Sequence, residues 1–113
     1  MEVSADDLAY VTVDTARERI EVHNGKRLET RLRSSRFRFD PERRVWFQRF
    51  RGEGDLLPVL AWLVSQKIPL HESVRLNPRH LETLTPCLSV RFVGEGAGAK
   101  AVIETVEWTG RES

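Results

Sequence analysis

Short runs in which apolar and polar residues alternate, a period typical of β-strands, recur along the chain. Residues 11–13 (VTV) and 20–22 (IEV) alternate in this way and predict two short strands around a tight turn. Residues 68–76 (IPLHESVRL) predict a further strand. Residues 87–109 predict a C-terminal hairpin, because two alternating segments flank a flexible, glycine-rich loop.

Other segments carry a helical pattern instead. In residues 26–35 (KRLETRLRSS) two leucines fall on one helix face and the charged residues point to solvent. Residues 56–64 (LLPVLAWLV) are apolar on most sides, which predicts the central buried helix of the fold. We expect Asp55 to cap this helix and Pro58 to lie in its first turn. Residues 77–84 (NPRHLETL) predict a short capped helix.

The segment RFRFDPERRVWFQRFR, residues 36–51, predicts a β-hairpin around the turn sequence DPER. In its first strand, two phenylalanines alternate with two arginines. We therefore expect Phe37 and Phe39 to face the core together. Arg36 and Arg38 would then share the opposite, solvent-facing side.

These elements follow one another in the order β-β-α-β-β-α-β, with a short helix and a β-hairpin at the C-terminal end. We therefore predict an α+β domain with a mainly antiparallel sheet and two main helices. A chain of 113 residues suits a single compact domain over residues 1–113, with residues 87–109 as a sub-element.

The net charge of +1 conceals a strong asymmetry. Residues 26–51 contain ten Lys/Arg and three Asp/Glu, a local charge of +7. The rest of the chain contains eight Lys/Arg and fourteen Asp/Glu, a charge of −6. This distribution predicts a one-sided electrostatic surface, which is typical of proteins that bind a polyanion or an acidic partner.

Cys87 is the only cysteine, so an intrachain disulfide is excluded and a reducing compartment is favoured. The N-terminal residues MEVSADDL resemble no signal peptide. The longest apolar run, residues 56–64, has about half the length that a bilayer span requires. We therefore expect a cytoplasmic protein that does not bind membranes.

No motif predicts an enzyme, a metal site or a cofactor. The stretch GEGAGAK lacks the spacing of a phosphate-binding loop, and a strand rather than a helix follows it. The spacing of the soft ligands fits no common zinc site; these ligands are His23, His71, His80 and Cys87. Cys87 is better explained as a buried structural cysteine, and Asp40 as a turn-forming residue.

The candidate binding surface is the basic segment itself. Six arginines lie within residues 36–51, and only Asp40 and Glu42 oppose them there. One explanation needs no ligand: the methylene groups of these arginines would cover an aromatic core while their guanidinium groups stay in water. Their mutual repulsion instead favours phosphate binding, because a bound polyanion relieves it and releases counterions. The predicted nucleic-acid-binding residues are Lys26, Arg27, Arg31, Arg36, Arg38, Arg43, Arg44, Arg49 and Arg51.

The second strand of the hairpin carries aromatic residues on both faces. Trp46 and Phe50 fall on one face, and Phe47 falls on the other with Arg49. Unless both faces are covered, either Trp46 or Phe47 is exposed. The exposed ring is predicted to stack on nucleic-acid bases.

Residues 11–76 resemble two known families of small modules. The hairpin and the following helix are similar to the damage-recognition-type module that precedes some superfamily-2 DNA repair helicases. The matching features are Phe39-Asp40, Arg43, the strand at 46–50 and the helix at 56–63.

The sequence FDPERRVW, residues 39–46, also resembles the F-D-P-E-x-R-x-W hairpin of plasmid and phage DNA-processing proteins. Ser34 and Ser35 stand where that module has a glycine region. Both resemblances imply a DNA context. Neither implies a catalytic activity of this chain alone.

We therefore predict a non-catalytic nucleic-acid-binding domain with a preference for DNA over RNA. Its sequence specificity should be low, because the sequence contains no recognition helix with base-reading residues. The alternative is a protein-interaction module, an adaptor or inhibitor that docks its basic face on an acidic partner. That class includes a homodimer in which the acidic tail of one copy meets the basic face of another.

Overall fold

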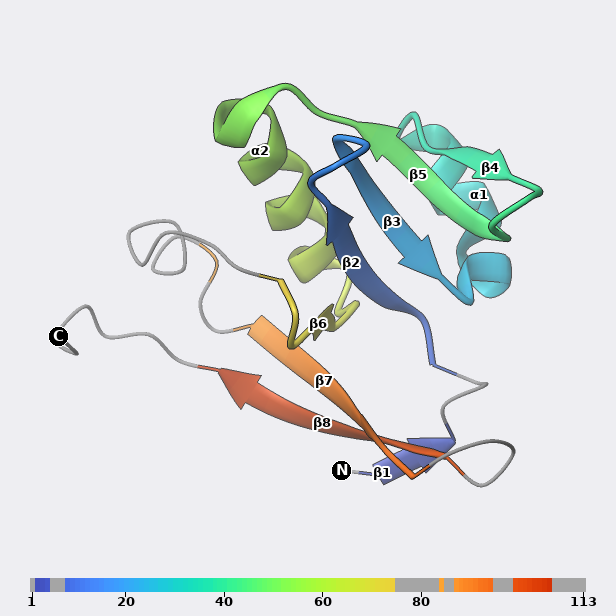
Figure 1. Ribbon diagram of the computed structural model, residues 1–113, viewed down its shortest axis with the longest axis vertical. Coiled ribbons are helices and arrows are strands. Elements are labelled where there is room, and N and C mark those ends of the chain that lie inside the picture. The colour runs from blue at the N-terminus through green and yellow to red at the C-terminus, as the bar shows by residue number, and fades with distance from the viewer. Residues whose placement is uncertain (1, 5–7, 75–83, 85–86, 95–98, 107–113) are drawn as a thin grey trace, which may run out of the picture.

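The computed structural model describes residues 2–4, 8–74, 84, 87–94 and 99–106 (Figure 1). The strands are β1 (Glu2–Ser4), β2 (Tyr10–Asp14), β3 (Arg19–His23), β4 (Arg38–Asp40), β5 (Val45–Arg49), β6 (Leu70–His71), β7 (Cys87–Val93) and β8 (Lys100–Val106). The helices are a 3-10 turn η2 (Gly25–Leu28), α1 (Glu29–Ser34) and α2 (Gly52–Ser65).

The described strands form one eight-stranded mixed sheet in the order β1-β8-β7-β6-β2-β3-β5-β4. Five neighbouring pairs are antiparallel, whereas β6 runs parallel to both β2 and β7. The predicted α+β class with two α-helices is confirmed in these residues. The predicted antiparallel character is interrupted at β6, because α2 returns the chain across the sheet in the direction of β2.

The predicted hairpins are present with short strands. The C-terminal hairpin pairs β7 with β8 from Cys87↔Val106 to Val93↔Lys100. The sequence did not predict β1, which adds to this hairpin through Glu2↔Val102. Most of the helix predicted at 77–84, the tip of the glycine loop and the end of the hairpin at 107–109 lie outside the described residues.

One face of the sheet packs against both α-helices. Val11 and Val22 of the sheet are fully buried with Leu32 of α1 and with Leu60 and Leu63 of α2. Figure 1 shows α2 crossing behind β2 and β3, while α1 lies behind β5 and β4. This face therefore contains the core of the basic half of the molecule.

The prediction that residues 56–64 form the central buried helix is confirmed in part. The helix buries one stripe, which contains Leu60 and Leu63, and exposes Pro58 and Ala61. It begins at Gly52, so Pro58 lies in its second turn rather than its first. Asp55 is not the cap residue, but its carboxylate accepts a hydrogen bond of 3.1 Å from the Arg51 backbone N–H just before the helix.

Both α-helices end in the same backbone motif. After α1, the N–H of Arg36 donates to the Arg33 carbonyl and that of Phe37 donates to the Leu32 carbonyl. After α2, the N–H groups of Lys67 and its successor make the equivalent bonds. Arg36 (φ 71°) and Lys67 (φ 63°) occupy the left-handed position that this motif usually gives to glycine. The motif satisfies the last carbonyls of each helix.

The prediction that Phe37 and Phe39 are both part of the core is wrong for Phe39, which lies on the helix-packed side of the sheet but is exposed. Phe37 is 3% exposed, but Phe39 is 46% exposed. Phe37 lies between α1 and β4, and its backbone N–H donates to the Leu32 carbonyl after the left-handed turn at Arg36. Phe39 lies on the outermost strand, where the core ends, and its ring contacts Trp46 at a centroid distance of 5.3 Å.

No helix among the described residues is long and apolar enough to cross a membrane.

Candidate nucleic-acid interface

The strand register divides the basic hairpin between two faces of the sheet. Arg38 pairs with Phe47, which in turn pairs with Glu21 of β3 on the face away from the helices. Phe39 pairs with Trp46 on the helix-packed face. The predicted cations therefore do not form one continuous row. Five of the nine line hollows on the two sides of β4.

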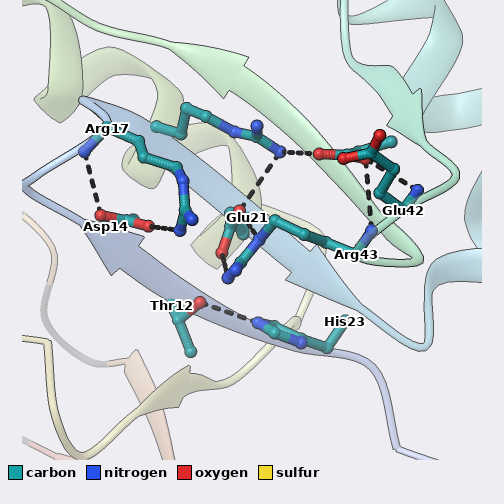
Figure 2. Close-up of polar contacts among 9 residues, drawn as sticks. Thr12, Asp14, Arg17, Glu21, His23, Glu42 and Arg43 are labelled. Carbon is teal, nitrogen blue, oxygen red and sulfur yellow. Dashed lines mark hydrogen bonds and ion pairs between the residues drawn. The ribbon is translucent and has the colours of Figure 1, made fainter.

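An ion-pair network covers the open face of the hairpin (Figure 2). Glu21 is 1% exposed, and its carboxylate accepts hydrogen bonds of 2.9 Å from Arg43 Nε and 2.8 Å from Arg43 Nη2. Arg19 Nη2 lies 3.2 Å from Glu21 Oε2 and donates to Asp40 Oδ2 at 2.8 Å. Arg43, one of the predicted phosphate ligands, is thus neutralised within the fold.

Asp40 joins the turn to this network. Its Oδ1 accepts the backbone N–H groups of Glu42 at 3.0 Å and Arg43 at 3.2 Å, which confirms its predicted role as a turn-forming residue. The hydrogen bond from Arg19 and those from the turn hold the pKa of the Asp40 carboxyl below its usual value. The Glu21 carboxylate raises the pKa of Arg43. The network therefore fixes the hairpin against β3.

Neither of the two aromatic residues predicted to stack on bases has a freely exposed ring. Trp46 is 6% exposed and packs beside Gly25, where an added Cβ would lie 3.0 Å from its Cδ1. Phe47 is half-buried, and the Arg19 guanidinium lies 3.9 Å from the centroid of its ring. The exposed aromatic ring of the hairpin is Phe39. Strand alternation could not identify it, because alternation assigns a face and not the distance from the core.

One hollow lies at the open edge of the hairpin. β4 pairs with β5 only through Val45, Trp46 and Phe47, so the end of β5 extends past it. The hollow measures about 480 Å³ and is lined by Arg36, Arg38, Phe47, Gln48 and Arg49. Its three arginines are exposed, and none has an acidic partner among the described residues. The edge hollow is therefore strongly cationic.

A second hollow lies between η2, α1 and the other side of β4. It measures about 330 Å³ and is lined by Asn24, Gly25, Lys26, Glu29, Arg33, Phe39, Arg44 and Trp46. We call it the Phe39 hollow. Its one carboxylate, Glu29, is engaged with Arg33 Nη2 at 2.8 Å. The exposed Lys26 and Arg44 have no acidic partner in the part of the chain that the structure describes.

The remaining predicted cations lie elsewhere. Arg27 and Arg31 are exposed on η2 and α1, and Arg51 is exposed just before α2. None of the three lines either hollow. Of the nine predicted residues, the structure thus brings Arg36, Arg38 and Arg49 together at one hollow and Lys26 and Arg44 at the other.

A cluster of rings occupies the centre of the open face. Tyr10 stacks on His23 with 4.5 Å between the ring centroids and 3° between the planes. His71 and Phe92 complete the cluster, and His23 Nε2 lies 2.8 Å from Thr12 Oγ1 (Figure 2). Burial lowers the pKa of His23, and the charges of Arg43 and His71 lower it further against the opposing effect of Glu21.

No group of three or more metal-ligand side chains occurs among the described residues. Cys87 is 6% exposed, so the prediction that it is buried is confirmed, and burial raises the pKa of its thiol.

Comparison of the chain with protein-family models, with curated proteins and with solved structures gives no match. The resemblances to helicase-associated and plasmid or phage modules therefore stay predictions. A function has to be argued from the geometry of the site itself.

Proposed function

We propose that this chain is a non-catalytic nucleic-acid-binding domain whose β4–β5 hairpin contacts phosphates. The observation that carries the proposal is a concentration of uncompensated charge. Arg36, Arg38, Arg44 and Arg49 are exposed on or beside a three-residue strand and have no acidic partner among the described residues. The neighbouring Arg43, in contrast, pairs with Glu21.

Phosphate is the ligand that fits this arrangement best. Guanidinium groups bind phosphate oxygens through two parallel N–H donors, and several of them can follow a sugar–phosphate backbone. Like charges held this close repel one another, and a polyanion removes that repulsion while it releases its own counterions. The proposed partner is DNA rather than RNA, as the two resemblances imply, in the cytoplasm.

The ion-pair network supports the same proposal by a different route. Glu21 and Asp40 fix Arg19 and Arg43, which tie the hairpin to β3. A hairpin held in this way presents its free arginines from a rigid support, so less conformational entropy is lost when they bind. The six-residue helix α1 presents no row of base-reading residues, so the proposed binding has low sequence specificity.

The test is equilibrium binding of labelled single- and double-stranded oligonucleotides over a series of salt concentrations. We expect the affinity to fall steeply with salt. The double variant Arg38→Ala with Arg49→Ala should flatten the logarithmic slope by about 0.7–0.9 for each phosphate that the protein no longer neutralises. Lys67→Ala, which removes a cation from the loop between α2 and β6, is the matched control and should leave the slope unchanged.

Absence of binding at low salt would overturn the proposal, as would equal binding by the double variant and the wild type. If no oligonucleotide binds but a protein partner survives nuclease treatment, the basic hairpin docks on an acidic protein instead.

A further inference from the structure

We propose that the Phe39 hollow holds one unpaired nucleobase together with an adjoining phosphate, with the base stacked on Phe39. This inference rests on the proposed function, and it adds a ligand class and a site to it. The edge hollow with Arg36, Arg38 and Arg49 would contact the sugar–phosphate backbone of the ligand, whereas the Phe39 hollow would bind the base.

The first observation is the exposure of Phe39. Its ring is 46% exposed, although it lies next to a core residue, Trp46, that is 6% exposed. The two rings are inclined at 56° with their centroids 5.3 Å apart. Trp46 therefore supports Phe39 from the protein side and leaves the rest of the ring open to the hollow. A supported, exposed aromatic ring is the usual platform on which single-stranded bases stack.

The second observation is the size of the hollow. Its volume of about 330 Å³ lies at the lower end of the range for small-molecule sites, which begins at about 300 Å³. The hollow thus has room for one ring system and its substituents, and it is small for a dinucleotide cofactor. Gly25 lines the hollow and packs closely against the core, where a Cβ would lie 2.9 Å from Leu32 Cδ1.

The third observation is the charge of the lining. Three cations, Lys26, Arg33 and Arg44, surround one carboxylate, Glu29. Because Glu29 is paired with Arg33, the positive charge of Lys26 and Arg44 stays uncompensated. A ligand that complements this site must be aromatic and anionic at once. A nucleobase that carries a phosphate meets both conditions.

The base has to be unpaired. Stacking on Phe39 requires access to a face of the base, which a duplex covers on both sides. The same chemistry occurs in a single strand and in a free mononucleotide, so the experiment has to separate these two sources.

The experiment measures the affinity of the protein for three probes: an oligothymidylate, the same strand with abasic sites in place of all its bases, and thymidine monophosphate. Phe39→Ala is the test variant. Val93→Ala is the matched control, because Val93 on β7 is the other large exposed apolar residue among the described residues, at 50% exposure. The urea midpoint of each variant shows whether it is folded. If Phe39→Ala does not fold, Phe39→Leu removes the aromatic face and keeps the apolar bulk.

We expect Phe39→Ala to lower the affinity for oligothymidylate by about 5- to 150-fold, the effect of one base stacked on an aromatic ring. The salt slope and the affinity for the abasic strand should not change. Val93→Ala should bind all probes like the wild type. Saturable binding of thymidine monophosphate that depends on Phe39 would place a free nucleotide in the same site.

The inference is overturned if wild type and Phe39→Ala bind the normal strand equally, or if both prefer the normal strand over the abasic strand to the same degree. In either case a steep salt slope would still support the proposed function. If none of these probes binds even at low salt, the inference fails, and the proposed function then depends on the double-stranded oligonucleotides of the preceding experiment.

Discussion

Arg43 and Arg38 lie five residues apart in one hairpin, yet their surroundings are opposite. Arg43 donates two hydrogen bonds to Glu21, a carboxylate that is 1% exposed. Arg38 is exposed at the edge hollow and has no acidic partner among the described residues. The difference arises from position: the turn directs Arg43 back over β3, whereas Arg38 lies on the outermost strand.

The comparison shows that local charge density does not identify a binding residue. Glu21 lies more than twenty residues before Arg43 in the chain, so the sequence near the hairpin does not reveal the partner. Only the pairing of β3 with β5 brings the carboxylate under the arginine. Arg38, in contrast, lies on β4, the last strand of the described sheet, so no neighbouring described strand supplies an acid on that side.

The largest expected effect comes from removing the acid at the centre of the network. Glu21→Gln leaves the partly exposed Arg43 without a carboxylate and leaves the mostly buried Arg19 with Asp40 alone, and breaking up a largely buried ion-pair network is costly. We expect a loss of about 3 kcal/mol in the free energy of unfolding, measured by urea denaturation.

The exposed pair on α1 gives the matched control. Glu29→Gln removes a carboxylate 2.8 Å from Arg33 at the surface, and we expect a change within about 0.5 kcal/mol. If the two variants had similar unfolding free energies, the distinction between structural and free arginines would fail.

A second prediction separates the effect of an arginine's charge on binding from the effect of its backbone conformation on stability. Arg36 and Arg44 have positive φ values of 71° and 58°, so a side chain there is strained. Arg36→Gly and Arg44→Gly should each stabilise the fold by about 0.5–1 kcal/mol while they remove a cation from a hollow.

Lys67→Gly supplies the control for this prediction, because Lys67 has the same backbone conformation with a φ of 63°. Lys67 lies in the loop between α2 and β6, and this loop is away from β4 and β5 in Figure 1. All three variants should gain stability in urea, but only those at Arg36 and Arg44 should weaken oligonucleotide binding. A loss of binding in Lys67→Gly would show that overall charge, rather than the hairpin, governs the affinity.

The third and smallest effect concerns His23, which lies beside the network. Burial keeps the pKa of His23 below its usual value, so the unfolded chain binds this proton more tightly than the folded one. Stability should therefore fall as the pH is lowered through the ordinary histidine pKa of about 6.5. Urea midpoints between pH 8 and pH 5 measure this decline, and His23→Gln should reduce it. An identical pH dependence in the variant would contradict the assignment.

Much of the fold could be predicted because its signals are local. Alternation identified β2, β3, β5, β7 and β8, and the leucine spacing identified α1. The bounds of α2 were missed at the N-terminal end, because Gly52 to Asp55 contain no apolar residue to reveal the helix. The strand predicted at residues 68–76 is present as β6, which has only two residues. The strand β1 was not predicted, because three residues are too few for a period to be visible.

The site could be predicted only in outline. The sequence identified the basic hairpin, but three of its details depend on contacts between distant residues. The neutralisation of Arg43 requires Glu21, the burial of Trp46 requires the close approach of Gly25, and the exposure of Phe39 requires the sheet to end at β4. Each detail depends on the edge or face of the sheet at which the residue lies in the folded chain. The residues next to it in the sequence do not determine that position.

The pairing of β1 with β8 affects how the protein is made. Glu2 and Ser4 meet Val102 and Lys100, so β1 can pair only after a segment far along the chain has been synthesised. The β4–β5 hairpin and α2 need only nearby partners and can form while synthesis continues. The basic half of the molecule can therefore acquire its structure, and repel or attract other charged molecules, before the other end of the sheet exists.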